Sequence, residues 1–186
     1  MLHRIRECFN IKTEQLQNEI EVDETFIGGR TPNGQGGKGK TVVLGMVERS
    51  GKLISKVVEN RKSKTLIPII KENVKENSVI NTDELLSYNS LYKNYNHFSV
   101  NHSLKEYVRG KVHTNTIEGF WSFLKRGFKG IYHYISEKHL QKYLDEFVFR
   151  YNMRGCKDNP ITENERFNYF FCNMKNRLRY KDLICC

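Results

Sequence analysis

Three carboxylates stand where side chains could bind metal ions and act on a phosphodiester. Asp23 lies within a strand-like run, Asp83 directly follows a second strand-like run, and Glu118 is near the start of a helix-like segment. Hard divalent cations prefer oxygen ligands, and two such ions about 3.5–4 Å apart can stabilise both the attacking and the leaving oxygen of a phosphodiester. The three acids therefore indicate two-metal phosphoryl-transfer chemistry.

Each of these acids also has an ordinary structural interpretation, which the sequence leaves open. Asp23 could be a strand residue without a chemical role, and Asp83 could be a turn or helix-capping residue. Glu118 could be the last residue of a capping box that begins at Asn115. Successive side chains alternate between the two faces of a strand, so we expect Glu24 to point away from Asp23 and to stay outside the site unless the strand bulges.

The balance of charge indicates a polyanionic partner. The 186 residues include 31 Lys and Arg against 21 Asp and Glu, a formal net charge of +10. Such an excess favours nucleic acid, and the lack of a long apolar run or a basic amphipathic segment argues against a membrane. Five cysteines without a C-x-x-C pair, and an N-terminus without an apolar signal core, predict an intracellular protein with reduced thiols. It would lie in the cytoplasm or nucleoid if bacterial and in the nucleus if eukaryotic.

The order of the expected elements predicts an α/β fold. Three strands come first, the second and third joined by a hairpin turn, and a helix, a strand, a helix and a strand follow before a helical remainder. This order predicts a mixed five-stranded sheet flanked by helices, with a helical C-terminal part. The expected strands span residues 19–27, 41–49, 52–59, 78–83 and 97–101, and the expected helices span residues 63–76, 88–95, 116–126 and 136–151, with another after Pro160.

A glycine-rich stretch before the second expected strand contains a P-loop pattern. Residues 34–41 satisfy G-x-x-x-x-G-K-[ST], but such a loop binds phosphate only where it leads into a helix. Here it leads into the strand-like residues 42–47, so we predict a mobile basic loop rather than a nucleotide site.

Cations accompany the third acid on its helix. Glu118, Ser122, Lys125 and Lys129 recur at intervals of 4, 3 and 4 residues and form one polar face, whereas Trp121 belongs to the apolar face and is interpreted as a core residue. A metal ligand near a helix start, with cations further along, could hold a phosphate beside the metal. A solvated charged face would have the same pattern. The basic segment before the helix, residues 105–113, is open to the same two interpretations.

Four segments in combination resemble a known family of enzymes. They are VDETFIGG at residues 22–29, Thr82-Asp83 followed by Tyr88, HTNTIEGFWSFLKR at residues 113–126, and YLDEFVFRYN at residues 143–152. They resemble DDE transposases, and they look most like Merlin-type elements and their bacterial insertion-sequence relatives, which carry the ISXO-two-like transposase domain. The resemblance covers roughly residues 19–155.

The resemblance implies an RNase H-like fold in which Asp23, Asp83 and Glu118 bind two Mg²⁺ or Mn²⁺ ions. Water would cut a DNA strand at the element end, and the freed 3′-hydroxyl would attack target DNA in a direct transesterification. The partners would be the DNA of the element ends and of the target, with a homo-oligomer formed on the DNA. The residues expected to contact DNA, or to position Glu118 beside it, are Arg109, Lys111, His113, Asn115, Lys125, Arg126 and Lys129.

The resemblance also suggests how the chain is divided. We expect a short helical segment over residues 1–18, an RNase H-like catalytic domain over residues 19–155 and a helical extension over residues 156–186. Relatives commonly carry an N-terminal zinc-ribbon or helix-turn-helix module that reads the element ends, and residues 1–18 contain no cysteine pair for a zinc ribbon. Two interpretations remain open: an active strand-transferring enzyme, and a truncated or catalytically inactive DNA-binding remnant of a mobile element.

Overall fold

The elements lie close to where the sequence predicts them. The computed structural model describes residues 2–28, 39–100, 113–132, 135–155 and 161–172. The strands in this part of the chain are β1 (Glu19–Ile27), β2 (Thr41–Glu48), β3 (Leu53–Val58), β4 (Val79–Thr82) and β5 (Asn96–Ser99). The helices are α1 (Leu2–Glu7), α2 (Ser63–Asn73), α3 (Asn115–Gly127), α4 (Leu140–Asn152) and α5 (Glu163–Cys172), with the short helical segments η1 (Leu86–Lys93), η3 (Phe128–Tyr132) and η4 (Glu137–His139).

The helical segment expected over residues 1–18 is limited to α1, and α2 also ends earlier than predicted. Helix α2 was expected to reach residue 76, but it ends at Asn73. Val74 has extended backbone and forms a parallel bridge with Leu16, and both side chains are buried. A tertiary contact with a distant segment therefore ends the helix earlier than its local sequence indicates.

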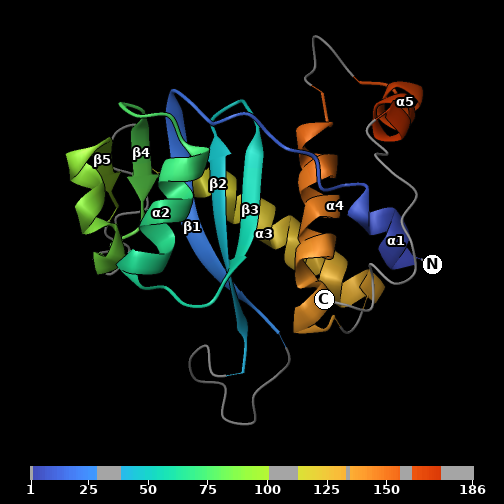
Figure 1. Cartoon of the computed structure of the whole chain (residues 1–186), viewed down its shortest axis with the longest axis horizontal. Coiled ribbons are helices and arrows are strands. Elements are labelled where there is room, and N and C mark those ends of the chain that lie inside the picture. The colour runs from blue at the N-terminus through green and yellow to red at the C-terminus, as the bar shows by residue number, and fades with distance from the viewer. Residues whose placement is uncertain (1, 29–38, 101–112, 133–134, 156–160, 173–186) are drawn as a thin grey trace. The chain divides into compact units, whose positions relative to one another are not determined.

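The five strands form one open, mixed sheet, as predicted. Their order is β3-β2-β1-β4-β5, with β1–β2 and β2–β3 antiparallel and β1–β4 and β4–β5 parallel. Figure 1 shows α2 in front of this sheet and α3 behind it. An antiparallel three-stranded meander followed by two parallel strands, with helices on both faces, is the arrangement of an RNase H-like fold.

The central strand, β1, extends beyond one of its neighbours. It pairs with β2 along residues 20–27 without a break, but it pairs with β4 only along residues 19–21. Asp23 and Glu24 therefore lie past the last β1–β4 pair, where the backbone of β4 no longer separates the two faces of the sheet.

Strand β2 is buried on both faces because helices cover both. Alternate residues belong to the core on the α2 face, namely Val42, Leu44 and Met46, packed with Leu66 and Ile70 of the helix. On the other face, Gly45 lies against Trp121 and Ile117 of α3. The near-continuous apolar run of β2 is thus explained by a helix on each side of it.

The described chain divides into two compact units. Residues 13–135 form the unit that contains the sheet, and residues 1–12 with 136–186 form the other. In this second unit, Arg6 of α1 bonds to Glu146 of α4, with 2.9 Å between Nε and Oε2 and both side chains buried. The guanidinium of Arg6 also lies 4.1 Å from the ring centroid of Tyr143. The predicted apolar stripe of α4 is buried, with Leu140, Leu144, Phe147 and Tyr151 all in the core.

Candidate metal centre

Three carboxylates from β1 and the end of β4 form a compact cluster. Asp23, Glu24 and Asp83 each offer one ligand oxygen, and these oxygens all lie within 4.8 Å of one another. Asp23 and Glu24 are adjacent in β1, and Asp83 is the first residue after β4. The structure therefore brings together two of the three predicted acids, Asp23 and Asp83. It adds Glu24, which was expected to stay outside the site.

The prediction that Glu24 stays outside the site is wrong, although Glu24 and Asp23 do point to opposite faces of β1 as expected. No bulge interrupts the pairing of β1 with β2. Glu24 bonds to Tyr88, a member of the core on the α2 face, whereas Asp23 bonds to Trp121 of α3. The two side chains thus leave opposite faces of β1. They still meet Asp83, because this residue lies beyond the last β1–β4 pair and can approach both faces.

Asp83 has the turn role that its sequence position allowed and also belongs to the cluster. Its Oδ1 accepts a hydrogen bond from the backbone N–H of Leu85 at 3.1 Å, two residues along the chain. A short Asp side chain after a strand commonly makes such a bond. The turn therefore orients the Asp83 carboxylate, and the two interpretations of this residue are compatible.

Two polar groups hold Glu24. The buried Tyr88 donates its hydroxyl to Oε2 of Glu24 at 2.7 Å, and Nη1 of Arg61 donates to Oε1 at 3.3 Å. Arg61 also lies 4.9 Å from the ring centroid of Phe26. These bonds fix Glu24 beside Asp23. The sequence analysis did not predict them.

Helix α3 is attached to β1 by two hydrogen-bonded contacts, of which the first is at Trp121. Nε1 of Trp121 donates to Oδ2 of Asp23 at 2.9 Å. The interpretation of Trp121 as a core residue is confirmed by its 4% exposure, but the sequence analysis missed its bond to the site. A buried indole N–H usually finds a hydrogen-bond acceptor, so a polar partner for Trp121 could have been predicted from the sequence.

The second contact joins the start of α3 to Glu21. This fully buried carboxylate accepts the backbone N–H of Thr116 at 2.8 Å, the Thr116 hydroxyl at 2.9 Å and the N–H of Ile117 at 3.1 Å. The first N–H groups of a helix lack partners within it and favour negative charge. Glu21 supplies both an acceptor and the charge.

The capping box proposed for Asn115 and Glu118 is therefore wrong. The N-cap residue is Thr114, one position earlier, and Glu21 binds two amides of the first turn. Glu21 lies two residues before Asp23, so the two side chains share one face of β1. That alternation was the signal by which Glu21 could have been found.

Arg49 and His113 also contact Glu21. Nε of Arg49 lies 2.9 Å from Oε1 of Glu21, and Nη1 of Arg49 pairs with Glu19. Nη2 of Arg49 donates to the carbonyl of His113 at 3.1 Å, and Nδ1 of His113 lies 3.2 Å from Oε1 of Glu21. The segment entering α3 is thus tied to β1 and to the residue after β2.

Glu118 lies on α3 between the two contacts with β1. It is exposed, and its Oε1 accepts the hydroxyl hydrogen of Thr114 at 3.2 Å. It follows Ile117, whose N–H binds Glu21, and it is one turn before Trp121, whose ring binds Asp23. Among the residues that the structure describes, the acids whose oxygens lie within 4.8 Å of one another are Asp23, Glu24 and Asp83. Glu118 therefore belongs to the helix attached beside the cluster rather than to the cluster itself.

The electrostatics of the cluster favour a bound cation. Burial, together with the neighbouring negative charges of Glu24 and Asp83, raises the pKa of Asp23 to about 7, against the opposing hydrogen bonds from Trp121 and from the backbone of Glu24. Burial also raises the pKa of Glu24, and the hydrogen bond from Tyr88 opposes this shift. Carboxylate oxygens are the ligands that Mg²⁺ and Mn²⁺ prefer, and a cation would relieve the repulsion between these acids. The donor set thus fits a divalent metal ion.

The match to known proteins decides the family. Residues 15–152 match the family described as the ISXO2-like transposase domain. The chain belongs to this family. It is also 36% identical over 107 residues to an uncharacterized transposase-like protein of Haemophilus influenzae, a match that covers 57% of this chain and 85% of the relative. Membership of a transposase family implies that the chain binds DNA and acts as a polynucleotidyl-transferase kind of enzyme.

Three of the cations expected to bind DNA are exposed, on α3 and on η3. In this transposase-family chain, Lys125 and Arg126 are exposed near the end of α3, and Lys129 is exposed in η3. Asn115 is also exposed, whereas His113 is half-buried beside Glu21. Arg109, Lys111 and residues 29–38 of the glycine-rich loop lie outside the described residues.

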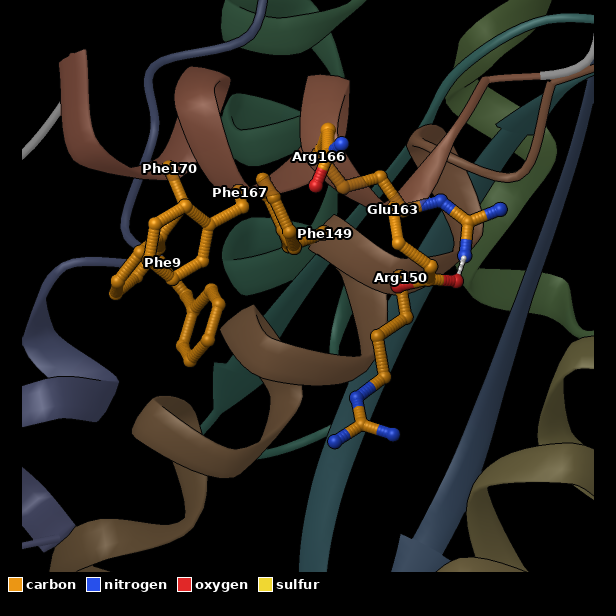
Figure 2. A pocket seen from close by; sticks show the side chains of 8 residues that line it. Phe9, Phe149, Arg150, Glu163, Arg166, Phe167 and Phe170 are labelled. Atoms are coloured by element: carbon orange, nitrogen blue, oxygen red, sulfur yellow. Dashed lines mark hydrogen bonds and ion pairs between the residues drawn. The ribbon is translucent and has the colours of Figure 1, made fainter.

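A pocket of about 690 Å³ lies in the unit that combines the first residues with residues 136–186 (Figure 2). Phe9 lines it, with its ring centroid 4.7 Å from that of Phe170 and 5.1 Å from that of Phe149. Arg166 lines it as well and pairs with Glu163 at 2.8 Å. Most of its lining residues lie outside residues 15–152, so the pocket is largely a feature beyond the matched transposase domain. Its ring contacts join the segment after α1 to α4 and α5.

None of the helices that the structure describes is both long enough and apolar enough to cross a membrane.

The raised pKa of Asp23 predicts how the stability of the metal-free protein depends on pH. The pKa is about 7 in the folded chain and about 3.9 in an unfolded one. An acid with a raised pKa in the folded state favours folding while it is protonated, and this advantage is lost as the pH rises from about 4 to about 7. We expect Asp23→Asn to be more stable than the wild type by about 2–4 kcal/mol at pH 8, and to lose that advantage at pH 4.

Urea unfolding with EDTA present, followed by circular dichroism from pH 4 to pH 8, measures this difference. The control is Asp145→Asn, because Asp145 bonds to Gln141 and is not a member of the cluster. Parallel stability curves for the wild type and Asp23→Asn would show that the Asp23 carboxylate is not destabilised by its surroundings.

Proposed function

We propose that this chain is the catalytic domain of a DDE-type transposase that cuts a DNA strand and joins the freed 3′ end to target DNA. Asp23, Asp83 and Glu118 are the catalytic residues and would bind two divalent ions, Mg²⁺ or Mn²⁺. The observation that supports this most is the carboxylate cluster formed where β4 ends beside the middle of its parallel neighbour β1, with α3 hydrogen-bonded to Asp23. Such a site on an RNase H-like sheet suits phosphodiester chemistry.

The acids have different surroundings, and these suggest different roles. Asp23 accepts a hydrogen bond from the indole of Trp121, and Asp83 accepts one from the backbone N–H of Leu85. Glu24 is bonded to the Tyr88 hydroxyl and to Arg61, so it adds negative potential to the cluster while it is held by its own partners. When bound, the metal ions would supply an activated water and stabilise the charge that develops at the scissile phosphate.

Residues of the chain would hold the DNA in line with this cluster. Lys125, Arg126 and Lys129 present exposed cations after Glu118 on the same helical segment, where phosphates could lie. Arg109, Lys111, His113 and Asn115 are proposed to bind DNA or to position Glu118, and residues 19–155 to form the catalytic domain. The partners would be element ends and target DNA, held by a homo-oligomer. Since the chain has a net charge of +10, DNA binding should weaken steeply with salt.

The test is metal-dependent nicking of a supercoiled plasmid and of a labelled duplex, with the wild type beside Asp83→Asn. Asparagine keeps an oxygen that can accept the Leu85 N–H, so the turn is retained while the charge is lost. We expect nicking with Mg²⁺ or Mn²⁺, none with EDTA, and none in the variant. Salt-dependent DNA binding should be retained in both proteins.

Two other outcomes would contradict the proposal in different ways. Nicking that persists in Asp83→Asn would place the chemistry elsewhere. Salt-sensitive DNA binding without any nicking by the wild type would instead support the alternative of a catalytically inactive DNA-binding remnant.

A further inference from the structure

We propose that Trp121 is a positioning residue that holds Asp23 in its metal-binding orientation, an inference that rests on the proposed function. Nε1 of Trp121 donates to Oδ2 of Asp23 at 2.9 Å, and the Trp121 side chain is 4% exposed. A buried N–H requires an acceptor, and here the acceptor is a carboxylate of the cluster. Trp121 acts on the reaction through Asp23.

The ring of Trp121 is fixed by the strand beneath it. Gly45 is the register partner of Asp23 on β2. A Cβ atom built at Gly45 would lie 2.5 Å from Cζ2 of Trp121 and 2.8 Å from Cδ1 of Ile117. The ring therefore occupies space that only a glycine leaves at this position, and its N–H reaches across to the neighbouring strand.

The helix that carries Trp121 is fixed at a second point. Glu21 accepts the N–H of Ile117 at 3.1 Å, four residues before Trp121, and Glu21 is two residues before Asp23. Two strand residues span about 6.6 Å and four helical residues about 6.0 Å. The spacing of the two anchors on β1 thus matches their spacing on α3. The indole N–H consequently comes from a rigid element rather than from a loop.

A fixed donor on a metal-binding carboxylate has a measurable consequence. Groups that hydrogen-bond to metal ligands set the orientation of those ligands, and their loss typically weakens metal binding by about 10–100-fold. Phenylalanine at position 121 would fill most of the same space but would lack the N–H. Because Trp121 is the single tryptophan of the chain, tryptophan fluorescence reports on the surroundings of this residue.

The test compares Mn²⁺ binding by the full-length wild type, Trp121→Phe, Asp23→Asn and Ile117→Val, measured as free Mn²⁺ by electron paramagnetic resonance. We expect Trp121→Phe to bind Mn²⁺ about 10–100-fold more weakly than the wild type, and Asp23→Asn to lose detectable binding. Ile117→Val is the matched control, because it trims a buried side chain of α3 without touching the Trp121–Asp23 bond. It should lose thermal stability and keep the Mn²⁺ affinity of the wild type.

The outcomes separate this inference from the proposed function. If the wild type binds Mn²⁺, Asp23→Asn does not, and folded Trp121→Phe binds within about twofold of the wild type, the positioning role is overturned and the metal site stands. If the wild type binds no Mn²⁺, the metal site and this inference fail together.

A second measurement applies if Trp121→Phe does not fold. Mg²⁺ is titrated into the wild type while Trp121 emission is recorded, with Asp83→Asn as control. A saturable change in the wild type alone supports the inference, and constant emission at Mg²⁺ concentrations that raise the melting temperature overturns it.

Discussion

Glu118→Ala is expected to abolish nicking while leaving the fold intact. If Glu118 completes the metal site, its removal should lower the nicking rate by at least about 10²–10³-fold, the usual cost of losing one group that stabilises the transition state. The melting temperature should fall by no more than about 2–3 °C, because Glu118 is exposed and the first amides of α3 are bound by Glu21. Plasmid nicking with Mn²⁺ and thermal unfolding by circular dichroism measure the two quantities.

Two variants of the same helix sharpen this experiment. Glu118→Gln keeps an oxygen for the Thr114 hydroxyl and removes only the charge, so it should be as inactive as Glu118→Ala. Ser122→Ala changes an exposed residue one turn later and should nick at the wild-type rate. A Glu118→Ala protein that melts far below the wild type yet nicks normally when folded would make Glu118 a structural residue of the helix start.

Glu21→Ala is expected to show the opposite pattern, with a large loss of stability. The variant leaves the amides of Thr116 and Ile117 without their acceptor and removes the buried partner of Arg49. Removing one member of a buried ion pair typically costs about 3–5 kcal/mol, and the lost helix contacts act in the same direction. Urea unfolding at pH 7, followed by far-ultraviolet circular dichroism, measures the change in the free energy of unfolding.

The matched control for this experiment is Glu48→Ala. Glu48 is an acid at the end of β2 that bonds to the exposed side chain of Asn18 and has no bond to α3 among those described. We expect its replacement to cost less than about 1 kcal/mol. Equal unfolding midpoints for Glu21→Ala and the wild type would show that Glu21 does not hold α3 to the sheet.

Together, the two variants separate catalysis from helix anchoring. The capping box that the sequence allowed would place both duties on Glu118. The structure assigns the anchoring to Glu21, which is far away in the chain but lies against the first turn of α3. The stability of Glu21→Ala therefore tests the anchoring of α3, and the nicking activity of Glu118→Ala tests the proposed catalytic role.

Much of the fold follows from local patterns in the chain. The β-branched runs of β2 and β3 and the turn between them predict a hairpin, and the structure has these strands as antiparallel neighbours. The apolar spacing of α4 predicts the buried stripe that is observed. These features depend on residues within one or two turns of each other, so the sequence contains the information directly. The end of α2 was missed because a bridge from Leu16 to Val74 decides it.

The sequence also contained enough to single out Asp23 and Asp83. Each follows or interrupts a strand-like run, and an acid in such a place needs a partner or a role. Their meeting at one edge of the pairing was not predicted, because it depends on β1 and β4 being parallel neighbours in the sheet. Local chemistry thus singled out the two residues, and the tertiary structure brings them together.

The rest of the candidate site depends on contacts between segments that are distant in the chain. Glu24 joins the cluster because β1 continues past its last pair with β4, a matter of relative strand length that alternation alone does not reveal. Gly45 leaves room for the ring of Trp121, which bonds to Asp23, while Glu21 binds the start of the same helix. Periodicity shows which face of an element is apolar, but the depth at which two elements pack, and hence which polar atoms meet, is decided only when they are packed together.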